Sequence, residues 1–251
     1  FFDPIRSLTI QYSMMQRATV SGQRILEVLD VPKATKDAPN ALDLEQCAGE
    51  VFFRHVDFSY APDTPVLTDI NFAIRPGEKV AIVGPTGSGK STIAALLRRF
   101  YDVNSGQVLI DGHDVRDLSQ ASIGRHVAMV LQDPFLFSGT IFDNIRYANS
   151  EKGASDIEAA ARAVGAHDFI MRLPGGYQFS LDQRGVNLSR GQRQLLSFAR
   201  ALVADTRILI LDEATANVDS YSEMKIQKAL NSLLQGRTAI VIAHRLATIR
   251  E

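Results

Sequence analysis

The chain has 251 residues, of which 45% are hydrophobic and 22% are charged, enough for one large domain or two small ones. Its 27 lysine and arginine residues nearly balance 28 aspartate and glutamate residues, so nucleic acid is not an expected partner. No apolar run reaches about 18 residues, the N-terminal stretch does not read as a signal peptide, and the single cysteine excludes an internal disulfide.

Apolar residues recur at roughly helical spacing between residues 4 and 30, and Pro4 suits a first helical turn. The polar residues between them predict a helix on a surface and not a membrane span. Residues 31–49 contain two prolines, several charges and no clear period, so we predict a linker there.

From Glu50 onward the sequence changes to segments rich in β-branched and aromatic residues. Strands are expected at 51–58, 66–74, 79–83, 107–110, 127–130, 208–211 and 238–243. Helices are expected at 91–100 and through most of 139–203, with breaks at 174–176 and 185–191. The last two strands are continuous apolar runs, which are typical of parallel strands buried on both faces. Strands that alternate with helices predict an α/β fold.

The strongest motif follows the expected strand at 79–83 and fits the phosphate-loop pattern G-x-x-x-x-G-K-[ST]. It comprises Gly84, Pro85, Thr86, Gly87, Ser88, Gly89, Lys90, Ser91 and Thr92. Its glycines let backbone N–H groups point at phosphate oxygens, and the helix that follows adds the positive end of its dipole. Lys90 is expected to reach the β- and γ-phosphates of a nucleotide, and the Ser91 hydroxyl to bind Mg²⁺. An ordinary glycine turn is the alternative, but the flanking strand and helix disfavour it.

A second motif joins the apolar run 208–211 to two acids, Asp212 and Glu213. A buried strand of this kind delivers carboxylates to the edge of a sheet. Asp212 is expected to hold Mg²⁺ directly or through water. Glu213 is expected to act on the attacking water as a general base or positioning group. A strand that merely runs into an acidic turn is the alternative interpretation.

Residues 188–192, Leu-Ser-Arg-Gly-Gln, resemble the signature motif of ATP-binding cassette (ABC) proteins, usually Leu-Ser-Gly-Gly-Gln. They open a predicted helix whose N-terminus is itself suited to an anion. In the ABC family this N-terminus contacts the γ-phosphate of the nucleotide held by the opposite subunit. The resemblance therefore implies nucleotide contacts from Ser189, Gly191 and Gln192.

Four further residues match ABC landmarks in the family's order. Tyr60 matches the aromatic residue that stacks on adenine, and Gln132 matches the glutamine that approaches Mg²⁺ and touches the transmembrane domain. Asp219 matches the D-loop residue, and His244 the switch histidine that contacts the γ-phosphate. Taken singly, they read as a rim aromatic, a loop amide, a helix N-cap and a structural histidine. Their joint order and spacing favour the family roles.

The resemblance covers about residues 50–250 and implies a P-loop NTPase (RecA-like) fold: a parallel-sheet core, an antiparallel β subdomain and a helical subdomain at about 133–203. Residues 1–30 resemble the cytoplasmic end of the last transmembrane helix in exporters whose membrane and ATPase domains share one chain. We therefore expect a nucleotide-binding domain at 50–251, placed at the cytoplasmic face of a membrane. Its expected partners are the transmembrane domain of the same transporter and a second nucleotide-binding domain. The family normally continues past Glu251, so we expect a fragment.

Two positions depart from the family pattern. Arg190 stands where the signature usually has glycine, and Gln183, in a segment that resembles the exporter X-loop, stands where glutamate is usual. A cation at Arg190 could pair with phosphate or could obstruct a close backbone approach. Because Lys90, Asp212, Glu213 and His244 are intact, the combination resembles one subunit of a heterodimeric exporter. A homodimer remains the other arrangement.

The expected function is binding and hydrolysis of Mg-ATP between two such domains, coupled to export. One rival is a soluble ABC ATPase of chromosome maintenance or translation. Such proteins carry long coiled coils or a second cassette, and no sustained heptads lie between Lys90 and Ser189. The other rival is a regulatory cassette that binds ATP without hydrolysis, which the intact Glu213 and His244 disfavour.

Overall fold

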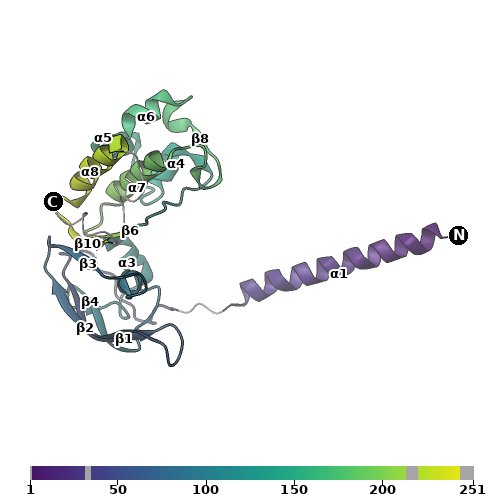
Figure 1. The fold of residues 1–251 in the computed structure, drawn as a ribbon, viewed down its shortest axis with the longest axis horizontal. Coiled ribbons are helices and arrows are strands. Elements are labelled where there is room, and N and C mark those ends of the chain that lie inside the picture. The colour runs from purple at the N-terminus through teal and green to yellow at the C-terminus, as the bar shows by residue number, and fades with distance from the viewer. Residues whose placement is uncertain (1, 32–34, 213–219, 244–251) are drawn as a thin grey trace. The chain divides into compact units, whose positions relative to one another are not determined.

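The computed structural model describes residues 2–31, 35–212 and 220–243 (Figure 1). The chain divides into two compact units, Phe1–Lys36 and Asp37–Glu251. The first unit is the helix α1 (Asp3–Leu29), which begins near Pro4 as expected and buries none of its residues. Among the helices that the structure describes, none combines the length and apolar character that crossing a bilayer requires.

The second unit contains an antiparallel sheet in the order β2 (Pro65–Ile74), β1 (Val51–Ser59), β4 (Ser105–Ile110) and β5 (His113–Asp114). Along β1 the side chains alternate between buried and less buried positions, as a strand with one face on the core requires. A register shift around His55, whose φ is 47°, interrupts the alternation with a bulge.

The second sheet is parallel, in the order β3 (Lys79–Val83), β10 (Thr238–Ala243), β9 (Ile208–Asp212) and β6 (Val127–Val130). The residues at 208–211 are all buried, because both faces of this sheet are covered. Ile208 and Ile210 pack in one core with α2 (Lys90–Leu97), α3 (Gln120–His126) and the antiparallel sheet. Leu209 and Leu211 pack in a second core, with helices.

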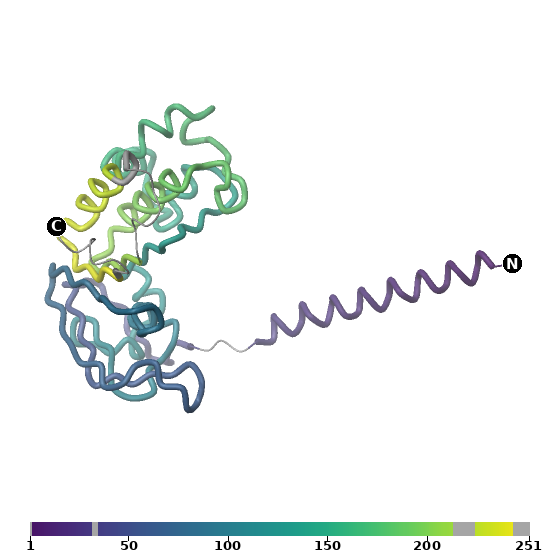
Figure 2. The backbone as a smooth tube through the Cα atoms, viewed as in Figure 1, coloured from purple at the N-terminus to yellow at the C-terminus, as the bar shows by residue number. Residues whose placement is uncertain are grey.

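That second core is formed by α4 (Ile141–Arg146), α5 (Ala154–Ala163), α6 (His167–Arg172), α7 (Arg190–Ala204) and α8 (Ser220–Leu234). β7 (Gly139–Thr140) and β8 (Ser180–Leu181) pair as a short antiparallel sheet, and α4, α5 and α6 lie between them in the sequence. In Figures 1 and 2 these helices lie on one side of the parallel sheet and the antiparallel sheet lies on the other. The predicted α/β class is confirmed: a parallel core carries an antiparallel part and a helical part.

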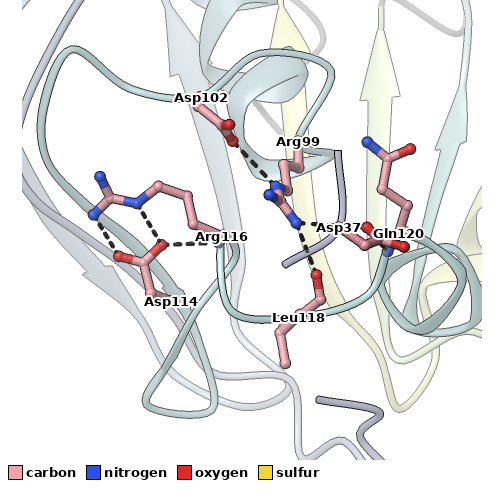
Figure 3. Close-up of polar contacts among 7 residues, drawn as sticks. All are labelled: Asp37, Arg99, Asp102, Asp114, Arg116, Leu118 and Gln120. Carbon is pink, nitrogen blue, oxygen red and sulfur yellow. Dashed lines mark hydrogen bonds and ion pairs between the residues drawn. The ribbon is translucent and has the colours of Figure 1, made fainter. Parts of the chain in front are cut away.

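The segment predicted as a linker is hydrogen-bonded to the second unit from Asp37 onward (Figure 3). The Asp37 carboxylate accepts a hydrogen bond from the backbone N–H of Gln120 at 3.0 Å and lies 3.7 Å from Arg99 Nη1. Arg99 is only 3% exposed just past α2, and it also donates to the Leu118 carbonyl and to Asp102. An arginine this buried needs such partners, so this network holds the segment in place at Asp37.

The end of the same segment is fixed by Asp111. Its carboxylate accepts hydrogen bonds from the backbone N–H groups of Ala48, Gly49 and Glu50 at 2.6, 3.0 and 2.7 Å. Burial, reinforced by Asp111, raises the pKa of the neighbouring Cys47 thiol to about 12. The thiol therefore stays neutral near pH 7 and is free of any disulfide.

Candidate nucleotide-binding site

The parallel sheet places several predicted motifs at one edge. All neighbouring strands run in the same direction, and Val83 pairs with Ala243 while Asp212 pairs with Ile242. The carboxyl ends of β3, β9, β10 and β6 therefore lie at the same edge of the sheet. At this edge are the P-loop after β3, Asp212 at the end of β9, and Gln132, exposed two residues beyond β6. The predicted site residues Glu213, Asp219 and His244 lie outside the described residues.

The P-loop turns tightly into α2 through two glycines. Gly87 and Gly89 have φ values of 86° and 85°, in the left-handed region that favours glycine. A Cβ on Gly89 would lie 2.5 Å from Leu67 Cδ2, so the loop also passes close to β2. The close turn aims the N-terminus of α2 out of the sheet edge, as phosphate binding requires.

Lys90 is 4% exposed and lies inside the loop that precedes it. Its Nζ donates to the carbonyl oxygens of Gly84 at 2.9 Å and Pro85 at 2.8 Å. An ammonium group carries three donors, so one remains for an anion. A buried cation beside the N-terminus of a helix is chemically suited to phosphate.

The predicted Mg²⁺ ligands Ser91, Gln132 and Asp212 include a single carboxylate. No group of three or more His, Cys, Asp or Glu side chains that could hold a metal occurs in the described part of the chain. Mg²⁺ is commonly bound by one or two carboxylates together with substrate phosphates and water. The donor set therefore fits Mg²⁺ that arrives with a nucleotide better than a resident metal centre.

Tyr60 is distant from the P-loop helix α2 in the sequence but contacts it in the fold. It follows β1, is 55% exposed, and shares a 3.1 Å hydrogen bond between its hydroxyl and Thr92 Oγ1. Thr92 is buried in the first turn of α2, two residues after Lys90. An aromatic ring thus stands directly beside the candidate phosphate site.

The signature-like residues form a helix cap. The Ser189 hydroxyl accepts from the backbone N–H of Gln192 at 3.2 Å, and Gln192 Oε1 accepts from the backbone N–H of Ser189 at 2.8 Å. This reciprocal capping box begins α7, and Gly191 is buried behind it. Ser189 and Gln192 therefore have a structural role in addition to the predicted contact with nucleotide.

Arg190 occupies the first position of α7. It is half-buried, and its guanidinium makes no hydrogen bond or ion pair with the residues that the structure describes. A cation at the positive end of a helix dipole is unfavourable unless an anion lies nearby.

Gln183 stands in a short turn, Gln183–Gly185, in which Arg184 and Gly185 have φ values of 61° and 64°. A Cβ on Gly185 would lie 2.9 Å from Leu136 Cδ1. The turn therefore packs against the segment that follows Gln132.

One exposed cluster of aromatic side chains was not predicted from the sequence. Phe135, Phe137 and Tyr147 lie together beyond Gln132, with ring centroids 5.1 and 4.5 Å apart. The Arg200 guanidinium lies over both Phe137 and Tyr147 and donates to the Phe135 carbonyl. Burial lowers the pKa of Arg200, but the side chain remains charged at neutral pH. Phe135 and Phe137, two aromatic residues close together in a loop, were the feature of the sequence that could have indicated this cluster.

A P-loop at the edge of a parallel sheet, with an antiparallel sheet on one side and a helical part on the other, defines a P-loop nucleotide-binding domain. Residues 67–216 match the model of the family described as ABC transporter, and the chain belongs to that family as its ATPase domain.

Three known proteins are similar to this chain over nearly all of its length. The chain is 48% identical over its whole length to the uncharacterized ABC transporter ATP-binding protein YknV of Bacillus subtilis, of which it covers 42%. It is 45% identical, over 99% of its length, to the ATP-dependent lipid A-core flippase of Syntrophus aciditrophicus, of which it covers 41%. It also resembles a solved bacterial Atm1-family ABC exporter with ATP bound, with a TM-score of 0.84 and 38% identity over 100% of this chain and 44% of that one. The chain thus spans about two fifths of the length of these relatives.

Proposed function

We propose that this chain binds Mg-ATP and hydrolyses it at a site completed by a second nucleotide-binding domain, and that hydrolysis drives export across a membrane. The observation that carries the proposal is the common sheet edge, where the P-loop, the end of β9 and Gln132 come together. The ATP bound in the similar Atm1-family exporter supports it.

Each residue at this edge has a role that its chemistry supports. The P-loop backbone and the free donor of Lys90 would hold the β- and γ-phosphates. Ser91, Gln132 and Asp212 would hold Mg²⁺, which neutralises charge on the phosphates when bound. Glu213, directly after β9, would position the attacking water and accept its proton, and His244, directly after β10, would contact the γ-phosphate. Asp219 would lie at the junction of the two domains.

The partner domain would supply its signature helix. By symmetry, the N-terminus of α7 in this chain would face the nucleotide of the partner. The cation of Arg190 at that N-terminus, which has no partner among the described residues, supports an anion there, while its bulk limits a close backbone approach. A partner chain with an unaltered signature and a second copy of this chain are both compatible with this site.

A transmembrane domain would be the other partner. Export is supported by the lipid A-core flippase and the Atm1-family exporter among the relatives, which this chain covers in part. Residues 1–30 would extend from the last transmembrane helix, so that the domain lies at the cytoplasmic face of the membrane. The exposed aromatic cluster of Phe135, Phe137 and Tyr147 beyond Gln132 is suited to contact that membrane domain.

The Glu213→Gln variant tests hydrolysis in a transporter that carries this domain. The amide keeps the size of the side chain but cannot accept the proton of the attacking water. We expect ATP binding to be preserved and phosphate release to slow about 100-fold or more. Glu78→Gln, in the turn before β3 and far from the carboxyl edge, is the control and should leave the rate unchanged. Rapid phosphate release by Glu213→Gln would refute the assigned role.

A further inference from the structure

Three aromatic side chains meet where β1 ends beside the P-loop helix. Phe58 is buried, and its ring lies 4.9 Å from that of Tyr60 and 5.8 Å from that of Tyr101. The Tyr60 and Tyr101 rings are 5.1 Å apart and nearly perpendicular, at 85°. Tyr101 belongs to the loop between α2 and β4, is 42% exposed, and entered none of the sequence motifs. Edge-to-face packing of this kind is a favoured aromatic geometry.

The backbone holds the two tyrosine-bearing segments together. The side-chain oxygen of Asn104 accepts from the backbone N–H of Ser59 at 2.7 Å. The backbone N–H of Asn104 donates to the Asp57 carbonyl at 3.0 Å. Only two residues therefore lie between Tyr101 and Asn104, which is bonded to the residue directly before Tyr60, so the ring contact does not depend on a free loop.

Tyr60 is thus held at three places. Its hydroxyl is hydrogen-bonded to Thr92 in the first turn of α2, and its ring packs against the rings of Phe58 and Tyr101. The hydroxyl of Tyr101, in contrast, makes no hydrogen bond with the residues that the structure describes. Whatever Tyr101 contributes at this site therefore comes from its ring.

We propose that Tyr101 is a positioning residue for the base of the bound nucleotide, and that it acts by fixing the plane of the Tyr60 ring beside the P-loop. The inference rests on the proposed nucleotide site and on Tyr60 as its base-stacking residue. An exposed aromatic side chain that is already ordered loses less entropy when a purine stacks on it. Tyr101 therefore strengthens the base contact and leaves the phosphate contacts untouched.

Two probes distinguish contacts with the base from contacts with the phosphates. One is Mg-ATP, and the other is inorganic tripolyphosphate with Mg²⁺, which has the phosphates alone. Binding of both to the 251-residue chain is measured by titration calorimetry for the wild type, Tyr101→Leu and Tyr101→Phe. We expect Tyr101→Leu to weaken ATP binding about three- to tenfold, the range an aromatic pair supports. Its affinity for tripolyphosphate should stay at the wild-type value, which also shows that the variant is folded. Tyr101→Phe keeps the ring and should bind both probes as the wild type does.

Three results would overturn the inference. Equal weakening of both probes by Tyr101→Leu would show a general structural role, and unchanged ATP affinity would show no role at all. A loss in Tyr101→Phe as large as that in Tyr101→Leu would assign the effect to the hydroxyl.

A third variant, Tyr60→Leu, separates this inference from the proposed function. We expect it to lose the preference for ATP over tripolyphosphate. If Tyr60→Leu loses that preference and Tyr101→Leu keeps it, the nucleotide site stands and the role of Tyr101 falls. A wild-type chain that binds neither probe would contradict the proposed function itself.

Discussion

At the scale of single residues, the P-loop depends on backbone conformations that only some residues adopt cheaply. Gly89 caps α2 in the left-handed conformation, and Lys90 closes the loop from within by bonds to Gly84 and Pro85. The sequence predicted these positions because the spacing of the motif encodes that geometry. It could not predict the bond from Tyr60 to Thr92 or the contact with Tyr101, because these join segments that only the tertiary fold brings together.

Gly89→Ala and Gly87→Ala separate backbone strain from a steric clash. Both glycines have positive φ, so an added Cβ costs about 1–2 kcal/mol of unfolding free energy at either position. Only at Gly89 does the new Cβ also meet Leu67 and the Val66 carbonyl; at Gly87 nothing lies within 4 Å. We expect Gly89→Ala to lose at least about 1 kcal/mol more than Gly87→Ala in chemical denaturation without nucleotide. Equal losses would show that the close passage over β2 carries no strain.

At the scale of elements, the signature-like residues at the start of α7 cap that helix and also have a proposed role in nucleotide binding. The serine and glutamine of the signature-like motif form a capping box, so the helix would begin at Arg190 even if no nucleotide were bound. The start of this helix was predictable from Ser189 and the apolar period after it. The short strands β7 and β8 were not predicted, because two-residue pairings leave no period in the sequence. Residues 37–49 lack a period for another reason: they are held by hydrogen bonds to distant residues, such as those from Asp37 to Gln120 and from Asp111 to the end of the segment.

Ser189→Ala compared with Thr140→Ala distinguishes the two roles of Ser189. Thr140 caps α4 in the same way, by accepting from the backbone N–H of Asp143 at 3.0 Å, but it lies outside the proposed site. Each substitution should reduce the free energy of unfolding by about 1 kcal/mol. In the assembled transporter, phosphate release should fall with Ser189→Ala and stay near the wild-type rate with Thr140→Ala. Equal rates for the two variants would leave Ser189 with a capping role alone.

At the scale of the whole molecule, the order of strands explains why motifs far apart in the sequence form one site. The parallel arrangement β3-β10-β9-β6 places the ends of all four strands at one edge, and the apolar runs at 208–211 and 238–243 indicated such buried strands in advance. The order of the strands was not predicted from the sequence, because the resemblance implied only a parallel-sheet core with an antiparallel β subdomain and a helical subdomain. Under the proposed function, a second nucleotide-binding domain completes the site, and its contribution is not part of the fold of this domain.

Titration calorimetry of Mg-ATP with the wild-type chain and with Lys90→Ala tests whether the P-loop of this domain holds the phosphates of the nucleotide. Lys79→Ala is the matched control, because Lys79 is an exposed lysine at the opposite end of β3 from the P-loop. If the P-loop holds the nucleotide, the wild type and Lys79→Ala bind Mg-ATP equally, and Lys90→Ala binds it at least about tenfold more weakly because a charged hydrogen bond to phosphate is lost. Equal binding by all three proteins, or no binding by the wild type, would contradict this role of the P-loop.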